Sequence, residues 1–210
     1  MRKLDHDSAR GEWAHRVATA DGGAPLRVLG LAGSLRRGSY NRALLRAARD
    51  LAPEGVEVEL LDLAGIPFYD GDVEAGGDPE PVARLKGRIA AADALLIVTP
   101  EYNGGVPGVL KNALDWAPRP PHESALVGRP VVIMGASPSR GGTARAQAQL
   151  AEVLERSNAL PVDHQPVRIE RAPAKFDGAA EPRLVDEDAR RAVRAALDAL
   201  VGRGVLAPAA

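Results

Sequence analysis

The chain has 210 residues, of which 45% are hydrophobic and 26% charged, a composition typical of one globular domain with a full hydrophobic core. Its formal net charge of −1 at pH 7 gives no electrostatic basis for binding nucleic acid or an acidic membrane surface, since both favour a basic face. The absence of cysteine excludes disulfides, zinc–thiolate sites and a cysteine nucleophile, and it fits a cytoplasmic protein.

The amino-terminal region lacks the features of a targeting signal. Residues 1–25 are polar and contain no apolar core of the kind that a secretory signal requires. No apolar run in the chain approaches the ~20 residues that cross a bilayer, so no membrane partner is expected. We therefore predict a flexible tail over residues 1–25, one domain over residues 26–204 and a short tail over residues 205–210.

From Leu26 onward, short aliphatic runs alternate with longer segments of helical period. Strands are predicted at Leu26–Ala32, Val56–Leu63, Ala94–Thr99, Pro130–Ala136 and Leu160–Val167. Helices are predicted between and after them at Tyr40–Ala52, Val82–Ala92, Val106–Ala117, Thr143–Ser157 and Asp186–Gly204. Asp78 is the predicted N-cap of the second helix, with Pro79 in its first turn. Two long connections, Asp62–Asp78 and Arg168–Val185, are expected to be loops.

This regular alternation of strand and helix predicts a parallel sheet, because parallel neighbours need crossover connections. The third and fourth strands are almost wholly apolar, which is typical of central strands covered by helices on both faces. The fold class is therefore α/β, in a single doubly wound domain. Such sheets bind ligands outside the carboxyl ends of the strands where the strand order reverses, so the segments after the first, third and fourth strands form the candidate site.

The first of these segments, GSLRRGSYNR (Gly33–Arg42), has the composition of an anion-binding loop at a helix N-terminus. Its glycines have the spacing of a Walker A loop, but Ser39 stands where that loop carries its lysine, and the dinucleotide fingerprint is also missing. The alternative is an ordinary helix capped by Ser39, with solvated arginines. Donors that suit a compact terminal phosphate are supplied by Ser34, Arg36, Ser39 and Asn41.

The second segment, PEYNGG (Pro100–Gly105), directly follows a buried strand. Prolines stiffen it at both ends, and its paired glycines allow a flat ligand to approach the backbone closely. The alternative to a binding role is that Tyr102 is an ordinary surface aromatic residue and that Glu101 is a solvated carboxylate. The third segment, GASPSRGGTARAQ (Gly135–Gln147), again follows a strand and opens a helix with serine, arginine and paired glycines.

The chain resembles the NADPH-dependent FMN reductase family in three stretches taken in order, GSLRRGSYNRAL, PEYNGGVPGVLKNALDW and GASPSRGGTARAQ, with LLDLAGIPFYDGD in support. The resemblance implies a flavodoxin-like, five-stranded sheet of order 2-1-3-4-5, with a bound FMN. It further implies that the FMN 5′-phosphate is held by Ser34, Arg36, Ser39 and Asn41. The isoalloxazine and ribityl chain would be lined by Pro100, Glu101, Tyr102, Asn103 and Gly104, with Ser137 approaching the other edge of the ring.

The same resemblance implies the chemistry. NAD(P)H would pass hydride to N5 of the flavin and leave, and an acceptor would follow it into the same open pocket in a ping-pong cycle, so no protein side chain is expected to be catalytic. The acceptors would be flavins, quinones, azo dyes or metal oxyanions. Members of the family form homodimers or tetramers with sites near the interface, so Phe68, Tyr69 and the helix over residues 106–117 are interface candidates.

Other function classes fit parts of the sequence. A flavodoxin-type electron carrier would bind FMN without an NAD(P)H step, but such carriers are strongly acidic and cover the flavin with aromatic loops, whereas the aromatic content here is 3%. A P-loop nucleotide hydrolase needs the lysine that the first loop lacks. A flavin-fold protein that no longer binds FMN is a third alternative. The histidines are scattered and no metal-type spacing stands out, so no metal is expected.

Overall fold

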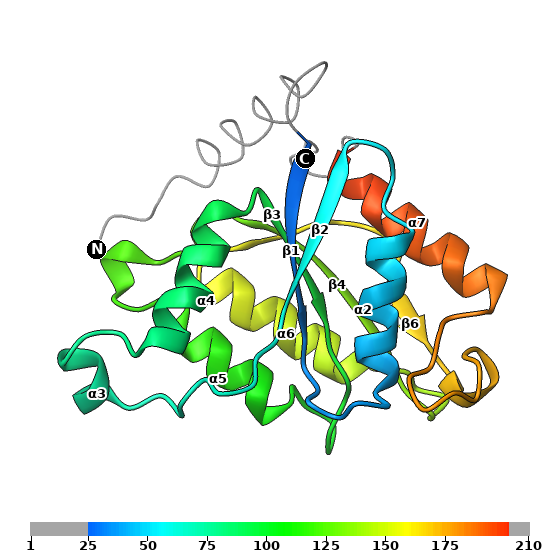
Figure 1. The fold of residues 1–210 in the computed structure, drawn as a ribbon, viewed down its shortest axis with the longest axis horizontal. Helices are drawn as coiled ribbons and strands as arrows, with labels where there is room; N and C mark the ends of the chain where they lie inside the picture. The colour runs from blue at the N-terminus through cyan, green and yellow to red at the C-terminus, as the bar shows by residue number, and fades with distance from the viewer. Residues whose placement is uncertain (1–24, 202–210) are drawn as a thin grey trace.

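A parallel β-sheet forms the centre of the computed structural model, which describes residues 25–201 of the chain (Figure 1). Neighbouring strands pair in the order β2-β1-β3-β4-β5, which confirms the predicted flavodoxin-like topology. The strands of this path are β1 (Leu26–Ala32), β2 (Val56–Leu61), β3 (Ala94–Val98), β4 (Pro130–Ala136) and β5 (Leu160–Pro161).

The predicted fifth strand, Leu160–Val167, is divided in the structure. β5 pairs with the first residues of β4, and a further strand, β6 (Val167–Ile169), pairs in parallel with the last residues of β4. The expectation of a five-stranded sheet is therefore corrected to a six-stranded one. Pro161 and Pro166 lack the amide hydrogen that a continuous ladder requires, so the pairing with β4 breaks between β5 and β6.

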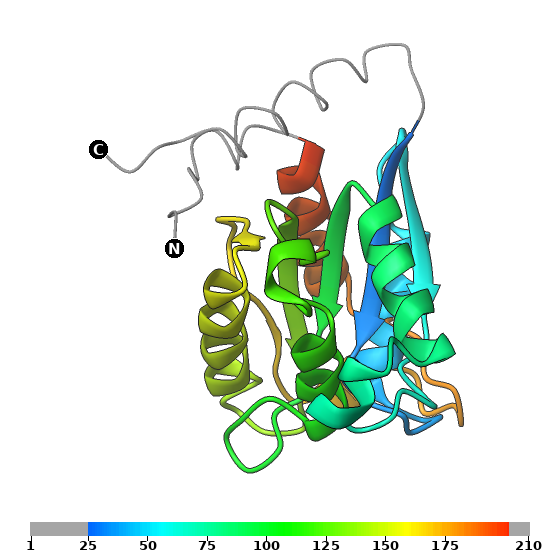
Figure 2. The same ribbon diagram turned by 90° about the vertical axis from the view of Figure 1, so that its left-hand side faces the viewer.

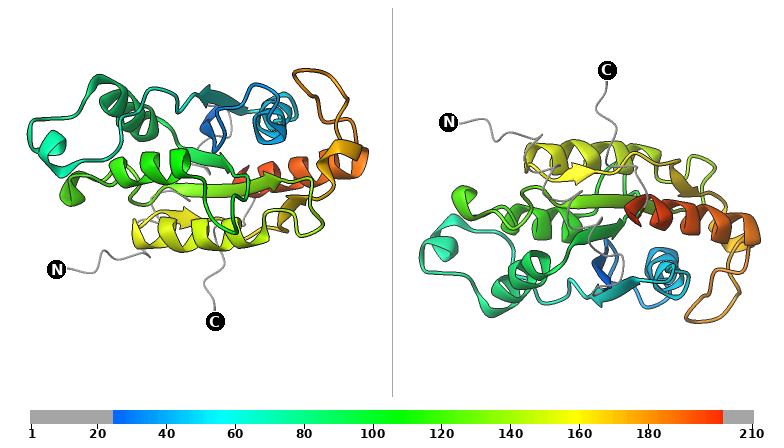
Figure 3. Two further views of the ribbon diagram at one scale, coloured as in Figure 1. Left: turned by 90° about the horizontal axis from the view of Figure 1, so that it is seen from below. Right: turned by 90° about the horizontal axis from the view of Figure 1, so that it is seen from above.

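Helices cover both faces of the sheet (Figures 2 and 3). The residues of one core cluster come from α2 and α7 and from one face of the strands, and those of the other come from α4, α5, α6 and the opposite face. β3 is buried along its whole length between the two clusters. The helices are α2 (Tyr40–Asp50), α3 (Gly71–Ala75), α4 (Glu80–Ala91), α5 (Gly108–Trp116), α6 (Ala144–Arg156) and α7 (Glu187–Val201), with 3-10 turns η1 (Pro121–Glu123) and η2 (Ala172–Ala174).

The five predicted helices are present, with shifted ends. The prediction that Asp78 caps α4 is wrong, because Pro79 occupies the cap position and the Asp78 carboxylate lies 2.6 Å from the ammonium group of Lys86. α5 begins two residues later than predicted, after Pro107, whose extended backbone (ψ 143°) occupies the cap position. The short helix α3 lies in a stretch predicted to be a loop, since five residues are too few to show a helical period.

Some predictions cannot be compared with the structure. The tails predicted over residues 1–25 and 205–210 lie outside the described residues, apart from residue 25, as does the end of the last helix at Gly204. Within the described part, no helix is both long and apolar enough to cross a membrane.

Candidate functional site

Three loops leave the sheet at its carboxyl edge, at the bottom of Figure 1. Backbone hydrogen bonds continue the sheet one residue beyond β1, β3 and β4, at Gly33, Thr99 and Ser137, so the loops start from neighbouring points. This confirms the predicted grouping of the segments after the first, third and fourth strands. We call them loop 1 (residues 33–39), loop 2 (residues 99–107) and loop 3 (residues 137–143).

Loop 1 presents hydrogen-bond donors that no protein atom accepts. Ser34 is 4% exposed, yet its hydroxyl has no partner among the described residues, and neither do the backbone amides of residues 34–38. The guanidinium of Arg36 lies over Gly38, with Nη1 3.5 Å from the position that a Cβ atom would take there. The unpartnered hydroxyl of Ser34, the free amides and a guanidinium form a donor set that fits the phosphate of FMN.

Ser39 and Asn41 have structural contacts in this loop. The Ser39 hydroxyl oxygen accepts from the amides of Asn41 at 3.2 Å and Arg42 at 3.3 Å, so Ser39 is the N-cap of α2, as the alternative interpretation of the sequence held. The Asn41 side chain donates to the carbonyl of Ala136 and accepts from its amide, both at 2.8 Å. These two bonds fix the start of α2 to the end of β4 and leave neither amide atom of Asn41 unpartnered.

Loop 2 contains a tight turn that fixes the shape of its tip. Tyr102 and Gly105 exchange two backbone hydrogen bonds of 3.1 Å, and the residues between them, Asn103 and Gly104, have positive φ angles of 52° and 79°. Two successive left-handed residues define a type I′ turn, for which Asn-Gly is the preferred pair. Tyr102 is 53% exposed, whereas Pro100 is buried against loop 1 beside Gly33.

Two side chains attach loop 2 to α6. A Glu101 carboxylate oxygen accepts from the amides of Arg145 at 2.9 Å and Ala146 at 3.2 Å, so it caps the helix that follows loop 3. Gln149 accepts from the amide of Val106 at 2.7 Å and fills the space next to Gly105. Neither contact could be predicted from local sequence patterns, since the partners are more than 40 residues apart.

Loop 3 is held by its own serines and by close packing. The Ser137 hydroxyl accepts from the amide of Ser139 at 3.2 Å and lies 3.0 Å from the hydroxyl of Ser139, so it stabilises a local turn. Below the loop, a Cβ atom on Gly135 would overlap both the hydroxyl of Thr143 and the carbonyl of Thr99. Only glycine allows β4, loop 2 and the start of α6 to approach so closely.

The predicted loop over residues 168–185 packs against loop 1 and α2. A Cβ atom on Gly38 would lie 3.1 Å from the carbonyl oxygen of Ala180, and Arg46 on α2 donates to the carbonyl of Pro182 at 3.2 Å. The rings of Tyr40 and Phe176 lie 5.1 Å apart. This segment therefore supports loop 1, which carries the unpartnered donors. The sequence analysis did not predict this role.

The predicted loop over residues 62–78 is attached to α5. Asn112 accepts from the amide of Tyr69 at 2.8 Å and donates to the carbonyl of Pro67 at 2.9 Å, and the indole of Trp116 donates to the same carbonyl at 2.8 Å. These bonds hold the backbone on both sides of Phe68. The Phe68 side chain nevertheless remains 85% exposed.

A polar cluster stabilises the far end of the same segment. The Tyr69 hydroxyl donates to Glu74 at 2.7 Å, and Arg119 donates to the same carboxylate oxygen at 3.1 Å. The hydrogen bond from Tyr69, helped by Arg119, holds the pKa of Glu74 below its ordinary value, and the bond to Glu74 raises the pKa of Tyr69. At neutral pH Glu74 therefore stays ionised and Tyr69 stays protonated. The cluster has a structural role, holding this segment to Arg119.

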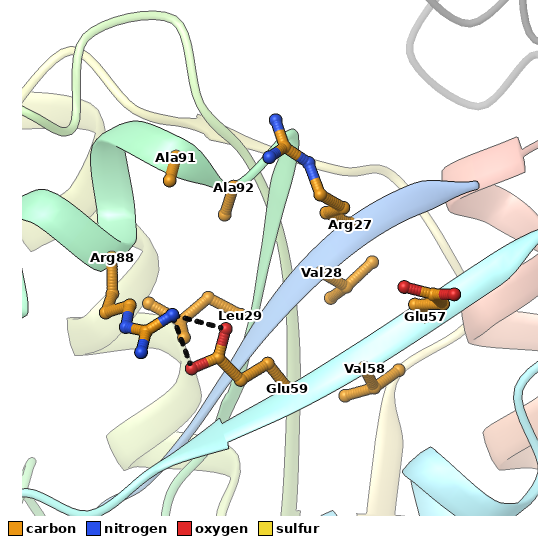
Figure 4. A pocket seen from close by; sticks show the side chains of 9 residues that line it. All are labelled: Arg27, Val28, Leu29, Glu57, Val58, Glu59, Arg88, Ala91 and Ala92. Atoms are coloured by element: carbon orange, nitrogen blue, oxygen red, sulfur yellow. Dashed lines mark hydrogen bonds and ion pairs between the residues drawn. The ribbon is translucent and has the colours of Figure 1, made fainter. Parts of the chain in front are cut away.

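Two cavities lie at opposite ends of the strands. One of about 180 Å³ adjoins loop 1 and is lined by Ser34 and by Arg42, which pairs with Asp62 at 3.1 Å. The other, of about 340 Å³, lies on the amino-terminal half of β1, where Arg88 of α4 reaches across to Glu59 of β2 (Figure 4). α4 ends there with the short side chains of Ala91 and Ala92, which leave the edge strand β2 partly uncovered. No group of histidines and carboxylates in the described part could hold a metal ion.

Comparisons with known proteins agree with this geometry. The family model for NADPH-dependent FMN reductase matches residues 26–173, which include all three loops. The chain is 49% identical over 175 residues to the NAD(P)H-dependent FMN reductase of Pseudomonas aeruginosa, covering 83% of this chain and 93% of that protein. It is 39% identical to the 2-hydroxy-1,4-benzoquinone reductase of a Burkholderia species, covering 82% of this chain and 93% of the relative.

A solved structure supports the same assignment. The flavoenzyme NAD(P)H:(acceptor) oxidoreductase FerB from Paracoccus denitrificans superimposes with a TM-score of 0.75 at 35% identity, over 83% of this chain and 94% of FerB. The resemblance that the three sequence stretches indicated is thus confirmed. The chain belongs to the NADPH-dependent FMN reductase family.

Proposed function

We propose that this protein is an FMN-dependent oxidoreductase that takes electrons from NAD(P)H and gives them to a small-molecule acceptor. FMN supplies the redox chemistry when it is bound, accepting hydride at N5 of its ring. The observation that carries the proposal is the set of unpartnered donors in loop 1, at the edge of the sheet where this fold binds ligands. The named relatives and FerB support the same class of reaction.

The roles of the loop residues follow from their contacts. Ser34, Arg36 and the amides of residues 34–38 bind the 5′-phosphate, while Ser39 and Asn41 hold those donors in place through α2 and β4. In loop 2, the amides of Glu101, Asn103 and Gly104 have no acceptor among the described residues and are free for the polar edge of the ring. The remaining wall of the ring site is formed by Pro100, Tyr102 and Ser137.

Glu101 acts in this site through α6. Its carboxylate accepts from two amides of α6, so the Glu101 side chain positions the loop 2 backbone, while the Glu101 amide remains free for the ring. No side chain in these loops is required as a proton donor or nucleophile, because hydride transfer needs only an oriented donor and acceptor.

The acceptor is a flat or compact oxidant that replaces the nicotinamide in the same pocket. Quinones are the best supported class, since a relative is named as a benzoquinone reductase. Free flavins, azo dyes and metal oxyanions are further acceptors open to an exposed reduced flavin. Sharing one open site between donor and acceptor gives ping-pong kinetics.

The protein acts as a cytoplasmic homodimer or tetramer. Phe68 is 85% exposed on a segment that hydrogen bonds hold to α5. A cavity of about 400 Å³ between α5 and α6 begins at the neighbouring residue Tyr69 and combines apolar side chains, such as Leu114 and Val153, with the charged side chains of Lys111, Asp115, Arg119 and Arg156. An exposed aromatic ring next to a hollow with apolar and charged side chains is the pattern of a subunit interface.

The test is the spectrum of the purified protein. A yellow protein that releases FMN on denaturation, and that NADH or NADPH bleaches without oxygen, supports the proposal. Parallel lines in double-reciprocal plots with a quinone acceptor support the shared site. A yellow protein inert to both nucleotides would instead be a flavodoxin-type carrier, and a colourless protein that cannot be reconstituted with FMN would refute the proposal.

A further inference from the structure

The break between β5 and β6 opens the sheet next to α6. β5 pairs with residues 130–131 of β4, and β6 pairs with residues 134–136, so neither of these strands pairs with residues 132–133. Pro161 and Pro166 bound the connection between the two strands and cannot donate hydrogen bonds that would close the opening.

A hollow of about 200 Å³ lies at this opening, and we call it the α6 hollow. Ile133 of β4 lines it from the sheet, and Ala148 and Ala151 line it from α6. The alanine side chains are short, so the space between α6 and the sheet stays unfilled. The hollow therefore has apolar walls that an apolar group can contact.

Gln147 supplies the α6 hollow with a hydrogen-bond acceptor. Its side-chain nitrogen donates to the hydroxyl of Thr143 at 2.9 Å and to the carbonyl of Val167 at 3.0 Å. The Val167 carbonyl can only accept, so these bonds fix which end of the amide is the oxygen. Gln147 is 7% exposed, and no described residue donates to its Oε1 atom. A buried acceptor of this kind is satisfied by a donor from outside the chain.

The basic groups at the α6 hollow have no acidic partner. Val167 and Ile169 are buried in the core cluster of α2 and α7, so Arg168 between them faces α6. No hydrogen bond or ion pair engages the Arg168 guanidinium within the described part of the chain. His164 also lines the hollow, and its Nδ1 atom lies 2.8 Å from the carbonyl of Gln165. A carbonyl only accepts, so Nδ1 carries the hydrogen.

The α6 hollow differs in this respect from the two cavities at the ends of the strands. The cavity on β1 is lined by Glu57 and Glu59, and the cavity beside loop 1 by Asp62. No acid lines the α6 hollow. An unpaired guanidinium without a neighbouring carboxylate favours an anion.

We propose that the α6 hollow is a second ligand site, for a small organic molecule that combines a carboxylate, a hydrogen-bond donor and an apolar body. Arg168 binds the carboxylate, Gln147 accepts from the donor, and the apolar body packs against Ile133 and the two alanines. The hollow is smaller than a pocket for a drug-sized molecule, so the ligand has about ten non-hydrogen atoms.

This site is separate from the one formed by the three loops. The residues that line the α6 hollow belong to β4, α6 and the segment over residues 161–168, and none of them lies in loops 1 to 3. The proposal therefore does not depend on the proposed function. The Gln147 bond to Thr143 nevertheless connects the hollow to the last residue of loop 3.

The test is an NMR titration of the isotope-labelled, FMN-saturated protein with three probes. 3-Hydroxybenzoate has all three features, benzoate lacks the donor, and 3-hydroxybenzamide lacks the charge. We expect 3-hydroxybenzoate to bind with a dissociation constant of about 1 mM and to shift backbone amide signals of α6 and β6. Benzoate should bind several-fold more weakly, and 3-hydroxybenzamide about tenfold more weakly.

Two variants locate the probe. Arg168→Gln should weaken 3-hydroxybenzoate about tenfold and remove its advantage over the benzamide. Ala151→Leu should abolish binding by filling the hollow, and leucine keeps the helix because its helix propensity is close to that of alanine. The matched control is Arg194→Gln, which removes an exposed arginine of α7 that also lacks a partner among the described residues, and which should leave binding unchanged.

Three outcomes would overturn the proposal. One is shifts centred on loops 1 and 2, which would place the probe at the flavin site. The second is equal affinity in Arg168→Gln and the natural protein, and the third is that none of the three probes saturates. Each leaves the oxidoreductase function standing, because that function is measured with NAD(P)H and FMN and not with these probes.

Discussion

Ser34 and Ser39 are both buried hydroxyl residues in loop 1, and the structure gives them different tasks. The Ser34 hydroxyl has no partner among residues 25–201, so Ser34→Ala should weaken FMN binding about tenfold and leave the free energy of unfolding unchanged. Ser39 caps α2, so Ser39→Ala should lower the free energy of unfolding by about 1 kcal/mol. Urea unfolding of the apoprotein and FMN titration by flavin fluorescence measure the two effects. Equal loss of stability in both variants would contradict this division.

At the scale of single residues, the sequence predicted which segments form the site but not how each side chain is used. Ser34 and Arg36 keep the unpartnered donors that a phosphate loop requires. Asn41 was expected to hold phosphate, and its amide instead bonds Ala136, 95 residues away. A side chain's partner depends on which strands lie next to each other, and that information is not contained in local spacing.

Glu101 shows how one side chain couples two elements. Because its carboxylate accepts two amides at the start of α6, Glu101→Ala should lower the free energy of unfolding by about 1 kcal/mol. It should also blue-shift or broaden the flavin absorption, because loop 2 loses its attachment. Glu101→Gln keeps one acceptor and should recover most of the stability. The matched control is Glu155→Ala near the end of α6, which should change neither property.

α7 is fixed at its start by Asp186. This carboxylate accepts from Lys175 and, at 2.9 Å, from the amide of Ala189, and these bonds hold its pKa below the ordinary value of 3.8. A lowered pKa in the folded state means that the stabilisation is complete above the unfolded pKa and is lost as the pH falls through the folded pKa. The stability from Asp186 should therefore begin to fall below about pH 4 and be fully lost only below the lowered pKa of the folded state.

Two variants separate the charge of Asp186 from its capping role. Asp186→Asn keeps an oxygen acceptor for the amide of Ala189 but loses the charge opposite Lys175. Between about pH 2 and 5, its free energy of unfolding should therefore change less with pH than that of the natural protein, by the contribution of one titrating carboxyl group. Asp186→Ala should lose about 1 kcal/mol more at neutral pH, because the cap is also gone. Thermal unfolding followed by circular dichroism against pH gives both values. Identical pH profiles for the natural protein and Asp186→Asn would contradict the assignment.

At the scale of elements, alternating aliphatic runs and helical periods were sufficient to predict β1 to β4 and the five longer helices in their order. The predictions failed where proline changes the backbone. Pro161 and Pro166 interrupt the last sheet segment, and Pro79 and Pro107 displace the starts of α4 and α5. The ends of these helices and strands depend on the missing amide hydrogen or the fixed φ angle of a single proline. The period of the hydrophobic residues does not reveal either effect.

Across the whole molecule, the two long segments that were predicted only as loops define the surroundings of the site. The segment over residues 168–185 supports loop 1 from the α2 and α7 face, and the segment over residues 62–78 extends along α5 on the other face. The site therefore lies over the carboxyl ends of the strands. The two long segments flank the site from opposite faces of the sheet. This arrangement leaves Phe68 projecting from one flank, where a second subunit can cover it.

Phe68→Asp tests the interface at this largest scale. The hydrogen bonds of Asn112 and Trp116 hold the backbone on either side, so the substitution should leave the fold and the thermal midpoint of the monomer unchanged. A charge in the centre of an apolar interface should weaken association at least about tenfold, which sedimentation velocity would measure over a range of concentrations. Val185→Asp is the control, because Val185 is 53% exposed and precedes α7, far along the chain from α5. If Phe68→Asp and the natural protein dimerise equally well, Phe68 lies outside the interface.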